Sequence, residues 1–180
     1  DSFCGLPVVP FEKVESSHPS SEYQMFIAIG YSDLNKKRAG IFEQAKSKGY
    51  KLVSYVHPSV VVVGDFEFGE NCFVFENSVI QPFVKIGDDV IVWSGSLISH
   101  NTTIKDHCFI ASHVAIAGSS TIEPYCFLGT NCTLRNGIKI AKECVIGAGC
   151  VILEDTKEKE VFVTRSTAIP NFNRDLLKDI

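Results

Sequence analysis

The 180-residue sequence lacks several features that mark particular classes of protein. Its 17 basic side chains are outnumbered by 21 acidic ones, so a broad nucleic-acid-binding surface, which needs positive charge, is not expected. It has no apolar run near the roughly 18–20 residues that cross a bilayer, so no membrane partner is expected. It also opens without Met and without a signal peptide, which indicates a trimmed or processed chain.

The cysteines do not follow the pattern of an extracellular disulfide framework. Of seven, only Cys4 falls outside the multiples of six; the others are Cys72, Cys108, Cys126, Cys132, Cys144 and Cys150. Disulfides have no reason to obey such a rule, whereas a structural repeat does. We therefore interpret these six as buried free thiols that act as small apolar fillers, which favours a reducing, cytoplasmic setting.

The six-residue spacing extends to the large aliphatic residues. Sixteen consecutive positions six apart, from 62 to 152, are all apolar; chance gives such a run on the order of 10⁻⁵ of the time. A helix repeats its apolar positions every three to four residues and a strand every two. A strict period of six indicates short parallel strands joined by tight corners, with three hexads in each triangular coil of a solenoid.

Several segments make the sequence similar to a known family. The chain resembles the hexapeptide-repeat acyltransferases, and among them the sugar-nucleotide acetyltransferases of the PglD/NeuD type. The matching segments are Phe26–Gly30 (FIAIG), Tyr55–Ser59 (YVHPS), Ser99–His100, Thr103–Asp106 (TIKD), Cys126–Gly129 (CFLG) and Val145–Gly149 (VIGAG). The resemblance implies a mainly β fold, with a left-handed parallel β-helix over residues 57–155.

The two ends lie outside the repeat. Residues 1–56 predict a partial α/β, Rossmann-like domain: a strand over 23–30, a helix capped by Ser32 or Asp33 and ending near Ser47, and a strand over 52–56. Family members begin this domain with a Gly-rich turn, which is not found here. Residues 156–180 predict a loop, a short strand over 161–163 and a C-terminal helix over 171–180.

Histidine is the best candidate for the base that acetyl transfer needs, because its pKa lies near neutrality. Of the five histidines, His100 is the one that the resemblance places at the family's catalytic position, and it falls at a coil corner. The alternative interpretation is that His100 is an ordinary surface imidazole. Family members often have an acidic neighbour here that orients the ring. In this chain the neighbours are Ser99 and Asn101. The orienting group is left open between Asn101, Asp106 and a residue of another subunit.

The resemblance also implies the residues that bind the acetyl donor. Gly118, eighteen residues after His100, matches the position whose amide meets the thioester oxygen. Acetyl-CoA would be the cosubstrate, and Thr130, Gly147 and Ala148 match the family positions along its pantetheine arm. Arg135, Lys139 and Lys142 are candidates for binding its phosphates; the alternative is that they form an ordinary solvated charged face. No metal site is expected, because His107 and His113 do not have zinc spacing. We expect His107 to be solvent-exposed or bonded across a subunit interface.

The outward positions of the repeat predict how copies associate. Phe73, Phe109 and Phe127 share one outward phase, at intervals of eighteen or thirty-six residues, and favour a subunit interface. The resemblance implies a homotrimeric, cytoplasmic acetyltransferase that acts on an amino group, or less readily a hydroxyl, of a nucleotide-linked sugar for surface glycans. The alternatives are a serine-type small-molecule O-acetyltransferase and a non-catalytic β-helix scaffold.

Overall fold

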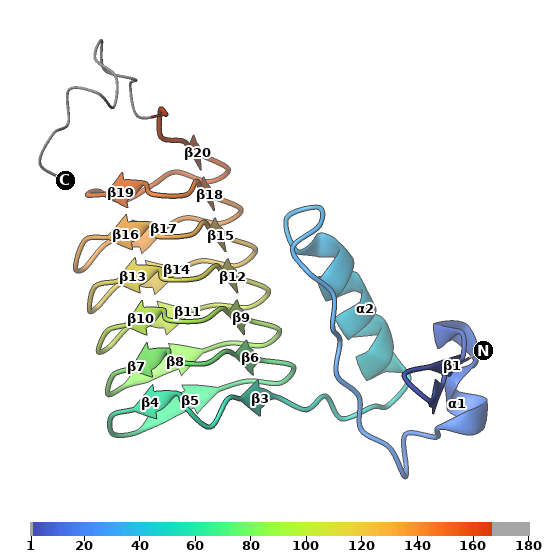
Figure 1. Cartoon of the computed structure of the whole chain (residues 1–180). Helices are drawn as coiled ribbons and strands as arrows, with labels where there is room; N and C mark the ends of the chain where they lie inside the picture. Colours follow the sequence, from blue (N-terminus) through green and yellow to red (C-terminus); the bar gives the residue numbers. More distant parts are fainter. Residues whose placement is uncertain (1, 167–180) are drawn as a thin grey trace, which may run out of the picture.

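The computed structural model describes residues 2–166 and is dominated by a parallel β-solenoid (Figure 1). Each coil contributes one short strand to each of three sheets, here called faces 1, 2 and 3 in chain order. Face 1 contains β3 (Tyr55–Val56), β6 (Phe73–Val74), β9 (Ile91–Val92), β12 (Phe109–Ile110), β15 (Phe127–Leu128), β18 (Val145–Ile146) and β20 (Val161–Phe162). Face 2 contains β4 (Val61–Val62), β7 (Val79–Ile80), β10 (Leu97–Ile98), β13 (Ala115–Ile116), β16 (Thr133–Leu134) and β19 (Val151–Ile152). Face 3 contains β5 (Phe66–Phe68), β8 (Val84–Ile86), β11 (Thr103–Ile104), β14 (Thr121–Ile122) and β17 (Lys139–Ile140).

The pairing register confirms the predicted coil of three hexads. Phe73 pairs with Ile91, and Phe109 pairs with Phe127, so each residue lies beside the one eighteen positions along. The aliphatic residues of the six-residue repeat point inward, and from Val74 to Ile152 none is more than 5% exposed. Burying one such side chain stabilises the fold by roughly 1.5–3 kcal/mol. Val62 and Phe68 are the exceptions, at 40% and 46%, because they lie in the first coil, which is packed on one side.

Two-residue turns form the three corners, and from residue 70 onward the second residue of each turn adopts a left-handed conformation. At the corner between faces 3 and 1 (the 3/1 corner), φ is 54° at Asn71, 56° at Asp89 and 59° at His107. Such a conformation costs a non-glycine residue about 1–2 kcal/mol, and the strands on either side hold it in place. The 1/2 corner carries the turns at 112–113, 130–131 and 148–149, and the 2/3 corner those at 82–83, 100–101 and 118–119.

The cysteines behave as the repeat predicts. All six that obey the six-residue rule are buried and free, and Cys4 is exposed. Burial raises the pKa of the Cys72 thiol to about 11 and that of Cys132 to about 12. The Cys72 and Cys132 thiols therefore stay protonated at neutral pH and serve as packing groups rather than nucleophiles.

The N-terminal part differs from the predicted strand–helix–strand unit. It contains β1 (Ser2–Phe3), β2 (Leu6–Pro7), the 3-10 helix Phe11–Lys13, α1 (Val14–Ser17) and α2 (Lys36–Ser47). The strand expected over 23–30 is reduced to one bridge between Met25 and Leu52, and the end of the second expected strand is β3 of the solenoid. The helix ends at Ser47 as predicted but starts at Lys36, because positive φ angles at residues 33–35 delay it.

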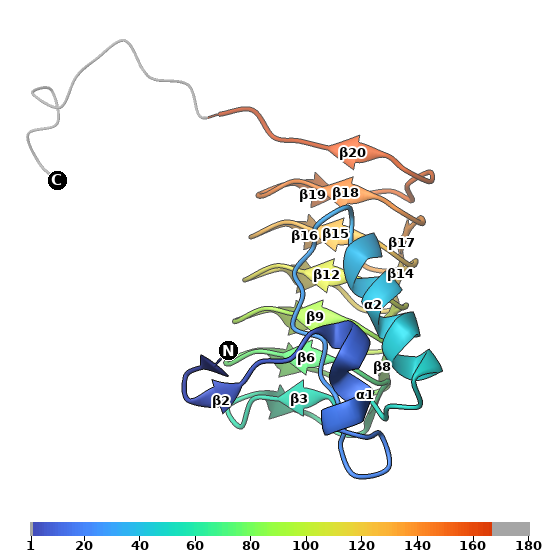
Figure 2. The same ribbon diagram turned by 90° about the vertical axis from the view of Figure 1, so that its right-hand side faces the viewer.

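The segment 26–31 (the strap) runs along face 1 and covers it, with α2 beside the solenoid (Figures 1 and 2). Tyr31 packs on Phe109 and Phe127, with ring centroids 4.9 and 5.0 Å away, and Phe26 packs on Phe73 at 5.4 Å. Phe109 is only 5% exposed. The expectation that this phenylalanine column forms a subunit interface is therefore wrong, because the chain's own strap covers it.

At the other end, β20 confirms the predicted last strand after the charged loop. The C-terminal helix expected over 171–180 lies outside the described residues. Within residues 2–166, no helix has the length and apolar character needed to cross a membrane.

Candidate functional site at the corner of faces 2 and 3

His100 lies on the exposed 2/3 corner, in the turn between β10 and β11. Its backbone is fixed on both sides. The N–H of His100 donates to Oε1 of Gln81 at 3.0 Å, and its carbonyl accepts the N–H of Ser119 at 2.8 Å. The corner therefore holds the main chain while the imidazole stays at the surface, where a substrate can reach it.

The ring of His100 has one side-chain partner among the described residues. Its Nδ1 lies 3.1 Å from Oδ1 of Asn101, the next residue in the turn. Because an amide oxygen only accepts, this contact favours the proton on Nδ1 and leaves Nε2 as an acceptor. Asp106, the other candidate for orienting the ring, lies at the 3/1 corner, where it accepts the N–H of Asp88 at 2.8 Å. Asp106 therefore does not orient His100 within the chain.

Gly118 stands one coil above His100, as the spacing predicts. A Cβ added at Gly118 would lie 2.6 Å from Cε1 and 2.8 Å from Nε2 of His100. The ring is thus packed against the Gly118 backbone. None of the described residues accepts a hydrogen bond from the Gly118 N–H, so this donor is available beside the imidazole.

Replacing Gly118 by Ala is expected to displace the His100 ring, because the added methyl group occupies its position. A displacement of about 1 Å in catalytic geometry costs roughly 10²-fold in rate. We therefore expect kcat to fall by about that factor with an unchanged fold, as measured by initial rates and circular dichroism. Gly137→Ala is a control at the same corner: Gly137 is the second residue of the next turn, where Gly118 is the first of its own, and an added Cβ meets no atom within 4 Å there. Its φ of 73° means that the control must first be shown to fold.

The other predicted site residues lie at other corners of the chain. Thr130 and Ala148 are in turns of the 1/2 corner, and Gly147 precedes the second of these turns. Lys142 is at the 3/1 corner, 3.9 Å from a carboxylate oxygen of Glu143 and 5.8 Å from the Tyr125 ring centroid. One chain therefore brings together His100, Asn101 and Gly118, and separates them from Thr130, Lys142, Gly147 and Ala148.

The two other residues proposed for phosphate binding differ in their surroundings. Lys139 lies 3.1 Å from a carboxylate oxygen of Glu123, and Lys105 lies 2.8 Å from the other. The hydrogen bond from Lys105, with a smaller contribution from Lys139, lowers the pKa of Glu123. Arg135 is exposed, beside the 2/3 corner. Lys139 is thus part of the charged surface of face 3.

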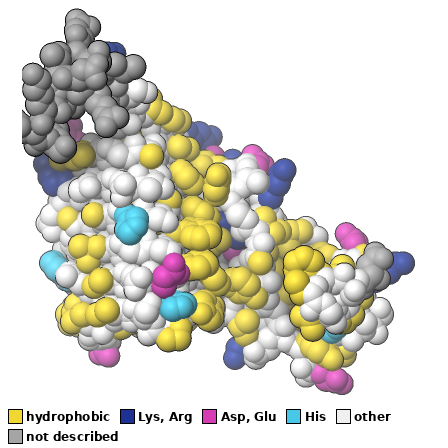
Figure 3. Space-filling view, viewed as in Figure 1, with side chains coloured by type: hydrophobic (Ala, Val, Ile, Leu, Met, Phe, Trp, Pro, Cys, Tyr) yellow, Lys and Arg dark blue, Asp and Glu magenta, His cyan; other side chains and the backbone are white. Residues whose placement is uncertain are grey.

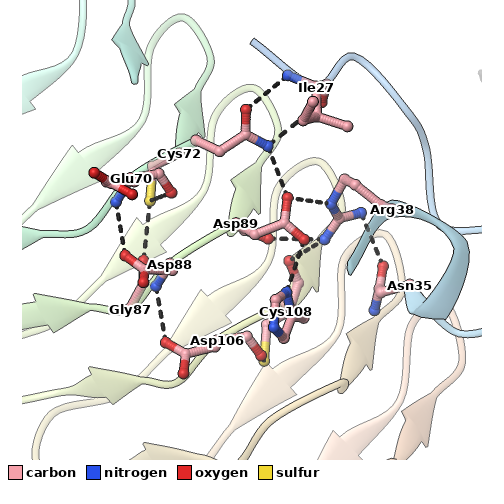
Figure 4. Close-up of polar contacts among 12 residues, drawn as sticks. Ile27, Asn35, Arg38, Glu70, Cys72, Gly87, Asp88, Asp89, Asp106 and Cys108 are labelled. Carbon is pink, nitrogen blue, oxygen red and sulfur yellow. Dashed lines mark hydrogen bonds and ion pairs between the residues drawn. The ribbon is translucent and has the colours of Figure 1, made fainter. Parts of the chain in front are cut away.

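A buried polar cluster at the 3/1 corner was missed from the sequence (Figure 4). Arg38 and Asp89 are fully buried, with Nε and Oδ1 3.0 Å apart. Nδ1 of His107 lies 2.9 Å from Oδ2 of Asp89, and Nδ2 of Asn71 donates to Oδ1 at 2.8 Å. His107 is 8% exposed, so the expectation that it faces solvent or another subunit is wrong. The signal was the eighteen-residue spacing of Asn71, Asp89 and His107.

No group of three metal-ligating side chains occurs among residues 2–166. The turn between faces 1 and 2 that carries His113 is separate from the turns that carry His100 and His107. His100, His107 and His113 therefore lie at three different corners of the solenoid.

Comparison with known proteins agrees with this fold. Residues 67–100 and 119–154 match the family model described as bacterial transferase hexapeptide (six repeats). The chain carries bacterial transferase hexapeptide repeats. A comparison of this hexapeptide-repeat chain with curated proteins gives no significant match.

Several solved structures share the fold over most of the hexapeptide-repeat chain. PerB from Caulobacter crescentus, in complex with CoA and GDP-perosamine, is 27% identical over 88% of this chain and 75% of its own, with a TM-score of 0.82. A histidine-to-alanine mutant of GDP-perosamine N-acetyltransferase from the same organism is 26% identical over 89% and 76%, with a TM-score of 0.83. The acetyltransferase domain of PglB from Neisseria gonorrhoeae is 25% identical over 89% and 77%, with a TM-score of 0.82. The resemblance expected from the sequence is confirmed.

Proposed function

We propose that the chain is an acetyl-CoA-dependent acetyltransferase that acts on an amino group of a nucleotide-linked sugar for surface glycans, in a reducing cytoplasm. One observation carries the proposal: on this fold an exposed imidazole is packed against a glycine whose N–H has no acceptor within residues 2–166. Support comes from the similar structures, which are of a GDP-perosamine N-acetyltransferase with CoA and GDP-perosamine and of an acetyltransferase domain. The left-handed sense of the coil belongs to the same proposal.

In this mechanism Nε2 of His100 removes a proton from the sugar amine as its nitrogen attacks the thioester carbon. The C–N bond forms, and the carbonyl oxygen gains charge, which the Gly118 N–H stabilises. The C–S bond then breaks, and His100 returns the proton to the sulfur of CoA. Asn101 holds the imidazole in the required tautomer through the 3.1 Å contact at Nδ1.

We also propose that face 2 packs against other copies in a homotrimer. Its outward column includes Val61, Leu97 and Val151, which are 53%, 38% and 62% exposed. Face 1 is covered by the strap, and face 3 carries the charged pairs of Lys85, Lys105 and Lys139, so face 2 is the apolar face that the described residues leave uncovered. Assembly along face 2 offers a way for the 1/2 corner of one copy, with Thr130 and Ala148, to meet His100 of another.

Binding of acetyl-CoA is the first test. A ligand that binds only the folded state raises stability by about 2.7 kcal/mol at a concentration of 100 times its Kd. We therefore expect millimolar acetyl-CoA to raise the Tm, measured by differential scanning fluorimetry, and pantetheine to raise it less. Release of free thiol in the presence of a nucleotide amino-sugar then reports acetyl transfer.

The alternatives give different outcomes in the same assay. A scaffold without catalysis shows no change in Tm and no thiol release with any acceptor. A serine-type O-acetyltransferase shows stabilisation by acetyl-CoA, and thiol release with a small hydroxylated acceptor but not with nucleotide amino-sugars. Either pattern would replace the proposed function.

A further inference from the structure

The proposed mechanism depends on one peptide group, which joins Ala117 to Gly118. Its N–H belongs to Gly118 and would stabilise the oxyanion, while its carbonyl belongs to Ala117. Because a peptide group is planar, whatever fixes the direction of the carbonyl also fixes the direction of the N–H. The hydrogen bonds of the Ala117 carbonyl therefore decide how the Gly118 N–H is presented.

Elsewhere in the solenoid, such carbonyls follow a rule of the repeat. The small buried residue two positions before an inward aliphatic donates from its side chain to the carbonyl fifteen residues further along, directly before a turn. Ser78 donates in this way to the carbonyl of Trp93 at 3.3 Å, and Ser96 to that of Ala111 at 3.0 Å. The same contact is made by the thiols of Cys72, Cys108 and Cys126.

The Ala117 carbonyl is the exception to this rule. The residue fifteen positions before it is Thr102, which is fully buried and whose hydroxyl has no hydrogen-bond partner among the described residues. The carbonyl instead accepts from Oγ of Ser120, three residues further along, at 2.8 Å. The carbonyl of Arg135, the usual acceptor for this position, lies farther from the same hydroxyl, at 3.2 Å. Ser120 thus donates its single proton chiefly to the peptide group of the candidate site.

The N–H end of the same peptide group has no such partner. One coil below, the N–H of His100 donates to the side chain of Gln81, nineteen residues before it. The residue nineteen positions before Gly118 is Ser99, whose side chain is shorter. The Gly118 N–H has no acceptor within residues 2–166. The peptide group is therefore fixed at its carbonyl and open at its N–H, the arrangement that an oxyanion donor needs.

We infer that Ser120 is a positioning residue, whose hydroxyl orients the peptide between Ala117 and Gly118 so that the N–H is directed to the thioester oxygen. Figure 3 shows histidine side chains at the surface of the solenoid, whereas Ser120 is 0% exposed and acts from the interior. Donation to the carbonyl also polarises the peptide group, which strengthens the N–H as a donor. The inference rests on the proposed function, since the oxyanion forms only during acetyl transfer.

An exchange between two side chains of the same shape tests the hydroxyl of Ser120. Ser120→Thr keeps the donor and Ser120→Val removes it. Val84 and Thr102 are buried at the equivalent positions of the two preceding coils, so this position of the repeat accommodates both side chains. We expect kcat to be roughly 5- to 50-fold lower in Ser120→Val than in Ser120→Thr, less than the 10²–10³ or so lost when an oxyanion donor is removed outright. The KM for acetyl-CoA should be equal in both, because the N–H acts on charge that develops after binding.

Ser78 provides the matched control for this exchange. It is equally buried and also donates to a carbonyl before a turn, but that turn lies at the 1/2 corner. Ser78→Thr and Ser78→Val should therefore share one kcat, although loss of the hydrogen bond lowers the Tm of the second. Equal kcat values for Ser120→Thr and Ser120→Val, or the same difference within the Ser78 pair, would leave Ser120 with a structural role only and overturn the inference.

The amide signal of Gly118 in nuclear magnetic resonance needs no turnover, so it separates this inference from the proposed function. The chain has 13 glycines, so labelling with ¹⁵N-glycine gives at most 13 backbone signals, and the one lost in Gly118→Ala identifies Gly118. We expect this signal to differ between Ser120→Thr and Ser120→Val and to coincide within the Ser78 pair, since Ser120 bonds to the peptide group that contains this amide.

The two measurements together assign each outcome. A Gly118 signal that differs between the Ser120 variants, in a protein without acetyl transfer, supports the positioning role and removes the proposed function. Acetyl transfer with the same Gly118 signal in both Ser120 variants supports the proposed function and removes the positioning role.

Discussion

Replacing His100 by Ala is expected to lower kcat roughly 10²–10⁴-fold, the usual contribution of a general base. The Tm should stay the same, because the imidazole is exposed and the backbone contacts of His100 to Gln81 and Ser119 do not involve the side chain. Initial rates with acetyl-CoA and a nucleotide amino-sugar measure the first effect, and thermal unfolding measures the second.

His113→Ala is the matched control for this variant. His113 is also an exposed histidine in a solenoid turn, but it lies at the 1/2 corner. The same chemical change there should leave kcat within a few-fold of the unmodified protein. If His100→Ala keeps full turnover, another group removes the proton and the proposed mechanism is wrong. Loss of turnover in His113→Ala alone would show that His113 at the 1/2 corner, and not His100, is the histidine that the reaction needs.

The second large effect is expected when Arg38 is replaced by Met. This change leaves the fully buried Asp89 carboxylate without its cationic partner. Breaking a buried ion pair costs about 3–5 kcal/mol, because one charge stays buried and uncompensated. We expect α2 to detach from the solenoid, so that hydrogen exchange of its amides accelerates roughly 10²–10⁴-fold while the amides of the solenoid strands keep their protection.

Lys36→Met on the same helix provides the comparison. Lys36 also forms an ion pair, at 3.0 Å from Glu143, but its side chain is 48% exposed. Exposed pairs contribute little because water screens them, so exchange in α2 should hardly change. If both variants behave alike, the buried cluster does not hold α2 in place. If Arg38→Met exposes the solenoid amides equally, the N-terminal part and the solenoid unfold as one unit.

The solenoid could be predicted from the sequence because the same pattern of buried and exposed residues recurs in every coil. Each hexad places one aliphatic residue inward, and the residues from Val74 to Ile152 are buried as expected. The corner position of His100 and its contact with Gly118 follow from the same arithmetic, since eighteen residues advance the chain by one coil. In such a fold the residues that pack together are separated by a fixed number of positions, so the local sequence pattern predicts the tertiary contacts.

The N-terminal part was predicted less well, since nothing in it repeats. The apolar run from Phe26 to Ile29 has the composition of a strand, yet its partners are aromatic side chains of the solenoid rather than a second strand. Arg38 is charged, so its complete burial depends on Asp89, which is distant in the sequence. Contacts between the repetitive solenoid and the non-repetitive N-terminal part produce no periodic pattern in the sequence, so they could not be predicted from it.

The left-handed turn residues have a consequence for how such proteins change over evolutionary time. At the 3/1 corner the same backbone conformation is adopted by Asn71, Asp89, His107, Tyr125 and Glu143. Five different side chains thus occupy equivalent positions, and the neighbouring coils set the backbone geometry of each. A substitution at this position therefore leaves the turn itself intact, and its cost depends on the contacts of the side chain, as the buried ion pair of Asp89 with Arg38 shows.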